Sequence, residues 1–133
     1  MKIGKSLYFD YQASAPTDPD VVKAMEPYWH DSFGNPHSTI HSVGWAAAAV
    51  VKESQAAVAD LIGADPDEIV LTSGATEANN MAMLGMAGRA RKNGRHRILV
   101  SAIEHKCVLE AARVASERFE LSIETIPVLN DGR

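Results

Sequence analysis

Three residues suited to binding an anion stand where an apolar run gives way to a helical pattern. Ser73, Gly74 and Thr76 lie in the stretch LTSGATEANN, residues 71–80, directly after the run over residues 69–72. A helix N-terminus offers unpaired N–H groups and the positive end of the helix dipole, and both favour phosphate. Gly74 would let a ligand approach the backbone, and the Thr76 hydroxyl would add a donor. The stretch is neither a P-loop nor a dinucleotide fingerprint, so it indicates no nucleotide.

The same residues also have a purely structural interpretation. Ser73 or Thr76 would cap the helix, and Glu77 would stabilise the positive end of its dipole from the first turn. Spacing alone favours this capping role over phosphate binding.

His105 occupies a comparable position, shortly after the apolar residues 98–100. Ligands of parallel α/β sheets bind where strands end and helices begin. A phosphate-binding turn and an imidazole from two strand ends would therefore form one site. A surface histidine at a helix start is the alternative, and it would be favoured if His105 stood alone.

Cys107, His37 and His41 are weaker candidates. Cys107 could act as a nucleophile, but it adjoins Val108 on an apolar helix face, where a small buried thiol is the commoner case. His37 and His41 are four residues apart, a spacing that suits a metal on a helix. Residues 34–36, Gly-Asn-Pro, predict a loop there instead, so we expect no metal site.

A basic segment follows the predicted phosphate-binding turn, and a helix C-terminus accounts for it because cations there stabilise the helix dipole. Gly94 would end that helix. No aromatic residues interleave the cations, and the net charge of −4 gives no general attraction to nucleic acid or anionic membranes. The cations are Arg89, Arg91, Lys92, Arg95 and Arg97.

The elements that must position these residues alternate between strand and helix. The pattern predicts strands over 69–72, 98–100 and 121–128 and helices from Ser42 to Gly63, over 76–92 and over 106–118. Ser42 is the expected N-cap of the first helix. This alternation is typical of a parallel α/β sheet.

The helix over 76–92 is apolar nearly all round, so we expect it to be buried. Gly85 and Gly88 lower its helix propensity and predict close approach of another backbone.

Residues 1–41 form an irregular arm punctuated by four prolines, with one short helix over 20–29 that Pro27 limits. Such an arm is expected to lie across another surface, in this chain or a partner. We therefore divide the chain into this arm, over 1–41, and a partial α/β domain over 42–133.

Composition places the chain among soluble globular proteins, with 46% hydrophobic and 23% charged residues. The single cysteine cannot form an internal disulfide, and the N-terminus lacks the apolar core of a secretory signal. The longest apolar run, residues 45–51, is too short to span a membrane. These features predict a cytoplasmic protein.

Several motifs together resemble the N-terminal part of the cysteine desulfurases, pyridoxal 5′-phosphate enzymes of the class V aminotransferase group. They look more like the branch serving iron–sulfur cluster assembly and nitrogen fixation than the alternative sulfur-mobilising branch. Ala13-Ser14-Ala15 departs from the family's common Ala-Thr-Thr. The matches are Tyr8-Phe9-Asp10-Tyr11 with Pro16, Phe33-Gly34-Asn35-Pro36 with His41 and Gly44, Thr72-Ser73-Gly74-Ala75-Thr76-Glu77, and Glu104-His105-Lys106.

The resemblance implies part of the large domain of a fold type I transferase, an α/β/α sheet. Ala75 and Thr76 would hold the cofactor phosphate, through backbone N–H groups and the Thr76 hydroxyl. His105 would stack on the pyridine ring and move protons. The family's reaction converts L-cysteine to L-alanine and transfers the sulfur to an enzyme cysteine.

In that family the cofactor-binding lysine, the aspartate facing the pyridine nitrogen and the sulfur-accepting cysteine all lie beyond the point that matches Arg133. Lys106 and Cys107 do not match them. We therefore expect only the phosphate and ring-stacking parts of the site, no turnover by this chain alone, and uncovered sheet edges and helix faces. A rearranged sheet, a homo-oligomer such as a dimer, or a complementary C-terminal chain would cover them, and sulfur-acceptor proteins are further expected partners.

Two other functions fit the same resemblance. One is a non-catalytic remnant or interaction module of the same fold. The other is part of a different class V enzyme, such as a selenocysteine lyase or an aminotransferase.

Overall fold

A computed structural model describes residues 2–132, and the chain divides into two compact units between Val70 and Leu71. Each unit is described by itself. The division into an arm over 1–41 and a domain over 42–133 stays a prediction about the organisation of the chain.

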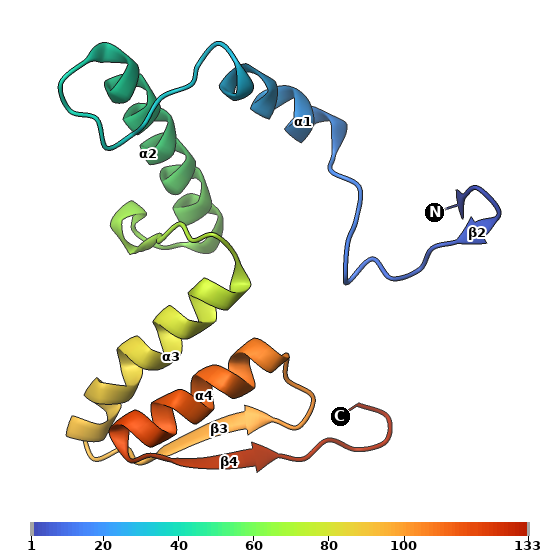
Figure 1. Cartoon of the computed structure of the whole chain (residues 1–133), viewed down its shortest axis with the longest axis vertical. Helices are drawn as coiled ribbons and strands as arrows, with labels where there is room; N and C mark the ends of the chain where they lie inside the picture. Colours follow the sequence, from blue (N-terminus) through green and yellow to red (C-terminus); the bar gives the residue numbers. More distant parts are fainter. Residues whose placement is uncertain (1, 133) are drawn as a thin grey trace. The chain divides into compact units, whose positions relative to one another are not determined.

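The first unit is mainly helical (Figure 1). As predicted, a short helix forms and Pro27 limits it: the α-helix ends at Met25, and Pro27 falls in the 3-10 turn that follows. The unit contains an antiparallel pair of short strands, β1 (Lys2–Ile3) and β2 (Ser6–Leu7), then α1 (Pro19–Met25), η1 (Glu26–Trp29), α2 (Ser42–Ile62) and η2 (Pro66–Glu68).

Helix α2 begins one residue away from the expected cap. His41, not Ser42, is the N-cap, because its backbone is extended and its ring Nδ1 accepts the Gly44 N–H at 3.1 Å. Gly44 itself is buried, and a Cβ there would stand 2.1 Å from the Ser38 carbonyl oxygen. The predicted stop is confirmed: Gly63 takes the left-handed conformation, with φ of 70°.

The second unit contains a two-stranded parallel sheet with two long helices (Figure 1). The predicted α/β alternation is confirmed for four elements: α3 (Ala75–Lys92), β3 (Arg97–Ser101), α4 (Lys106–Phe119) and β4 (Ser122–Ile126). The strands pair in register from Arg97 with Ser122 to Ser101 with Ile126.

The strand expected over residues 69–72 is wrong. That segment is irregular, and the side chains of Val70 and Leu71 are 60% and 57% exposed instead of buried. A strand needs a neighbour for its backbone groups. Within residues 2–132 the only ladders join β1 to β2 and β3 to β4. The Ile69 carbonyl instead accepts a hydrogen bond from Gln55 Nε2 at 2.8 Å.

Helices α3 and α4 pack closely because small residues line their contact. Around it lie the half-buried Met83, Leu84, Ile98 and Phe119. The buried residues of the unit are Ala87, Val100, Ala111, Ala112, Ala115 and Leu121.

The expectation that the helix over 76–92 is buried is wrong, because α3 packs along one side only. Ala87 is its one buried residue, and Met86 is 61% exposed. The prediction that another backbone approaches Gly85 and Gly88 is also wrong. Gly88 is approached by the Phe119 ring and not by a backbone, whereas Gly85 has open space around it.

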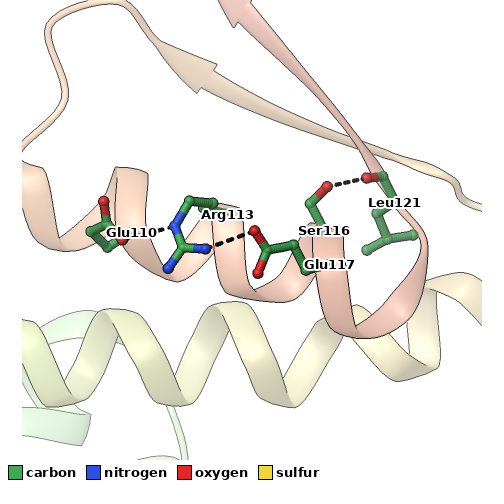
Figure 2. A network of polar contacts seen from close by, with 5 residues as sticks. All are labelled: Glu110, Arg113, Ser116, Glu117 and Leu121. Atoms are coloured by element: carbon green, nitrogen blue, oxygen red, sulfur yellow. Dashed lines mark hydrogen bonds and ion pairs between the residues drawn. The ribbon is translucent and has the colours of Figure 1, made fainter.

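Polar contacts run along α4, and one at its end reaches the residue before β4 (Figure 2). Arg113 binds Glu110 at 3.0 Å and Glu117 at 2.7 Å, and these two carboxylates raise the pKa of its guanidinium. The Ser116 hydroxyl donates to the Leu121 carbonyl, across the turn that joins α4 to β4. Helix and strand are therefore joined at the end opposite to His105.

None of the helices within residues 2–132 combines the length and apolar character that crossing a membrane requires.

Candidate functional site

The first turn of α3 carries the predicted phosphate-binding residues. Gly74 is the N-cap, with φ of 155° and ψ of −177°, a conformation that residues with a Cβ rarely adopt. Open space surrounds the position where a Cβ would stand. Ala75 and Thr76 are the first two helical residues, and both are exposed. The helix cannot satisfy their N–H groups, since its first internal bond runs from the Ala78 N–H to the Gly74 carbonyl, at 3.1 Å.

The N-cap of α3 is neither of the two residues, Ser73 and Thr76, that the structural interpretation proposed as caps. In the part of the chain that the structure describes, no side chain caps Gly74, so neither Ser73 nor Thr76 is the cap. Instead the Glu77 carboxylate accepts two hydrogen bonds, from the Ser73 hydroxyl and from the Ser73 N–H, each at 2.7 Å. These bonds, the hydroxyl first, lower the pKa of Glu77 below its ordinary value of 4.5. The Glu77 carboxylate thus binds Ser73, and the N–H groups of Ala75 and Thr76 can bind other acceptors.

His105 is the N-cap of α4, and its imidazole is exposed. Its Nδ1 accepts the Cys107 N–H at 3.2 Å and lies 3.0 Å from Cys107 Sγ. Cys107 is half-buried, whereas the structural interpretation predicted a buried thiol.

The Cys107 thiol also connects the two helices. Asn79 Nδ2, one turn beyond Thr76 on α3, lies 3.3 Å from Cys107 Sγ on α4. The N-terminal turns of both helices therefore lie side by side, at the carboxyl ends of β3 and β4 (Figure 1). Asn79 was not among the site residues predicted from the sequence. It could have been recognised as a polar residue three positions after Thr76 on a helix face that is otherwise apolar.

The electrostatics of this end of the unit favour an anion. Two helix N-termini face the same region, and each presents the positive end of its dipole. Backbone N–H groups, the Thr76 hydroxyl and one nitrogen of the His105 ring supply the hydrogen-bonding groups.

The other candidates have structural roles. His41 caps α2, and residues 2–132 hold no group of three or more His, Cys, Asp or Glu side chains that could bind a metal ion. The basic segment is a helix C-terminus, as predicted: α3 ends at Lys92, and Gly94 has φ of 75°. Arg91 pairs with Glu120 at 3.2 Å, and Arg97 with Glu124 at 3.1 Å.

Comparison with known proteins identifies the relatives of this chain. Residues 7–133 match the aminotransferase class-V family. The chain is 45% identical over 130 residues to a mitosomal cysteine desulfurase of Encephalitozoon cuniculi, covering 97% of this chain and 30% of that protein. It is 47% identical over 131 residues to the cysteine desulfurase IscS of Rickettsia massiliae, covering 98% and 32%.

Solved structures agree with this assignment. A structure described as SspA in complex with cysteine matches 91% of this chain and 34% of its own, with a TM-score of 0.77 and 36% identity. A NifS-like protein matches 92% and 33%, with a TM-score of 0.76 and 32% identity. The chain spans about a third of the length of these relatives. It belongs to the class-V aminotransferase family, in which it corresponds to the N-terminal portion of the cysteine desulfurases.

Proposed function

We propose that this chain supplies the phosphate-binding and ring-stacking parts of a pyridoxal 5′-phosphate site in a cysteine desulfurase. One observation carries the proposal. The Asn79–Cys107 contact joins the N-terminal ends of α3 and α4. It thus brings the turn formed by Gly74, Ala75 and Thr76 (the Thr76 turn) and His105 to one end of the sheet.

The residues at this end fit the cofactor's phosphate group. Ala75 and Thr76 present backbone N–H groups from the first turn of α3, and the exposed Thr76 hydroxyl adds a third donor. The open space at Gly74 lets an anion approach the backbone. The Glu77 carboxylate is directed to Ser73, where it accepts two hydrogen bonds, so it does not occupy the N–H groups of Ala75 and Thr76.

His105 fits the aromatic part of the cofactor. Its imidazole is exposed and fixed to the end of α4 through Nδ1, which leaves the ring face for stacking and Nε2 for moving a proton. Bound pyridoxal phosphate would supply the electron withdrawal that activates an amino-acid substrate. With L-cysteine as substrate, the complete protein would release L-alanine and pass sulfur to an enzyme cysteine.

The lysine and the sulfur-accepting cysteine of this reaction match no residue here, so turnover would need the part of the relatives that this chain does not cover. Exposed apolar side chains on the sheet support a covering partner, since Leu99 on β3 is 57% exposed and Ile126 on β4 is 50% exposed. We propose a homo-oligomer, such as a dimer, or a complementary C-terminal segment in this role, with sulfur-acceptor proteins as further partners. A cytoplasmic location belongs to the same proposal.

Titrating the chain with pyridoxal phosphate tests this function. Thr76→Val keeps the side-chain shape but removes the hydroxyl, and it should weaken binding by about tenfold, the size expected for one hydrogen bond to a charged group. Thr76→Ser should bind like the original chain. Inorganic phosphate should compete, and His105→Ala should weaken pyridoxal phosphate binding without changing phosphate binding.

The matched control is Thr125→Val on β4, which makes the same chemical change on the exposed strand. Equal affinities for the original chain, Thr76→Val and Thr125→Val would overturn the assignment of the phosphate site.

A further inference from the structure

Three side chains from two helices form a connected group beside the proposed cofactor site. Asn79 Nδ2 lies 3.3 Å from Cys107 Sγ, and Cys107 Sγ lies 3.0 Å from His105 Nδ1. We call these residues the Asn79–Cys107–His105 relay. Asn79 and Cys107 are half-buried, whereas His105 is exposed.

The backbone determines the direction of the hydrogen bonds at His105. The Cys107 N–H lies 3.2 Å from Nδ1 and can only donate, so Nδ1 must be the unprotonated, accepting nitrogen. In a neutral imidazole the proton then resides on Nε2.

The thiol reinforces the same arrangement. An amide nitrogen can only donate, so Cys107 Sγ accepts from Asn79, and its S–H remains to donate to His105 Nδ1. Every bond of the relay therefore runs from Asn79 through Cys107 toward Nδ1. A proton on Nδ1 would place donor against donor at the backbone N–H, and Cys107 Sγ would then have to accept from both Asn79 and His105.

We propose that Cys107 and Asn79 are positioning residues that hold His105 as its Nε2–H tautomer and fix the orientation of its ring relative to the Thr76 turn. This inference rests on the proposed function, because it concerns the histidine assigned to the cofactor ring. Asn79 stands one turn beyond Thr76, so the relay also couples the ring position to the phosphate-binding turn.

The tautomer can be observed without any cofactor. In the full chain labelled with ¹⁵N-histidine, long-range ¹H–¹⁵N spectra at a pH where the imidazole is neutral distinguish protonated from unprotonated ring nitrogens. We expect the Nε2–H pattern for His105. Cys107→Ala should raise the share of the Nδ1–H form about threefold, the size expected for losing one weak hydrogen bond. Cys107→Ser keeps a donor and acceptor and should retain the original pattern.

Asn79→Ala should change the His105 signals in the same direction by a smaller amount, since it removes only the second bond of the relay. Asn80→Ala is the matched control. It removes the neighbouring amide, whose Nδ2 binds the Thr76 carbonyl at 2.8 Å. Signals of His96, at the amino-terminal end of β3, should stay unchanged in every variant and so report intact folding.

Two results would overturn the inference: an Nδ1–H pattern in the original chain, or an unchanged tautomer ratio in Cys107→Ala with intact His96 signals. Pyridoxal phosphate affinity separates the inference from the function on which it rests. Weaker cofactor binding by Cys107→Ala, with unchanged binding of inorganic phosphate, supports both. A changed tautomer in a chain that binds no pyridoxal phosphate would overturn the proposed function and the assignment of the relay to a cofactor site.

Discussion

Gly88 on α3 lies against the Phe119 ring on α4, and a Cβ added at Gly88 would stand 3.1 Å from Phe119 Cε1. The same two helices meet at their other ends through Asn79 and Cys107. Because α3 and α4 are in contact near both ends, the spacing between the Thr76 turn and His105 is set by helix packing and not by a flexible loop.

The two glycines of α3 should respond differently to alanine. Gly85→Ala should stabilise the chain by about 0.5–1 kcal/mol, because alanine is the better helix former and nothing lies within 4 Å of the new methyl group. Gly88→Ala gains the same propensity but must displace the Phe119 ring, so its free energy of unfolding should be lower than that of Gly85→Ala. Urea unfolding of both variants measures the difference.

Gly88→Ala combined with Phe119→Leu is the control, because a smaller side chain leaves room for the methyl group. If Gly88→Ala and Gly85→Ala gain equal stability in the original background, the ring contact does not constrain α3.

Gly74→Ala should destabilise the chain by about 1–3 kcal/mol, the usual cost of a residue with a Cβ in a strained backbone region. The cause is conformational, since φ is 155° while the space around the site is open. Thermal unfolding measures the loss, with Gly85→Ala as the matched glycine substitution at an ordinary helical position. A stable Gly74→Ala chain would show that the turn adopts another conformation.

Glu77 should contribute an acid-sensitive part of the stability. Its folded pKa lies below 4.5, because the Ser73 hydroxyl and then the Ser73 N–H donate to its carboxylate. The stabilisation is therefore complete above about pH 4.5 and is lost as the pH falls through the lowered pKa. Glu77→Gln should be less stable than the original chain at neutral pH and should approach it as the pH falls through the lowered pKa of Glu77.

Unfolding midpoints measured across pH 3 to 7 provide the check. Ser73→Ala removes one of the two donors and should give a smaller effect in the same direction. Glu104→Gln, the same change at an exposed position before α4, is the control. Parallel pH profiles for Glu77→Gln and the original chain would contradict the role of this carboxylate.

Ala115→Leu should destabilise the chain by about 1–3 kcal/mol, because Ala115 is fully buried at the contact between α3 and α4 and a larger side chain would force the helices apart. The neighbouring Val114→Leu, on the exposed side of α4, should change stability by less than about 0.5 kcal/mol. Denaturant unfolding compares the two. The same Ala115→Leu change should weaken pyridoxal phosphate binding, since it separates the two helix N-termini.

Local signals in the sequence were sufficient for the helices and for the strands of the second unit. Helical spacing, Gly63 and Gly94 predicted α2, α3 and their ends, because a left-handed stop is a property of a few neighbouring residues. The resemblance carried by Thr76 and His105 likewise rested on short motifs, and the family comparison confirms the class to which they belong.

Contacts between distant residues decided the rest. The apolar run before Ser73 is no strand, since strand formation requires a paired neighbour that a local pattern cannot supply. The arrangement of the side chains at the candidate site also depends on contacts between distant residues. Asn79 and Cys107 are 28 positions apart, and only the packing of α3 against α4 brings the amide to the thiol. The sequence by itself indicated Thr76 and His105 as candidates for binding phosphate and moving a proton, because residue type and helix position are local properties. The tertiary structure alone decided that His105 is connected, through Cys107 and Asn79, to the helix that carries Thr76, because that connection depends on two helices packing through alanines and one glycine.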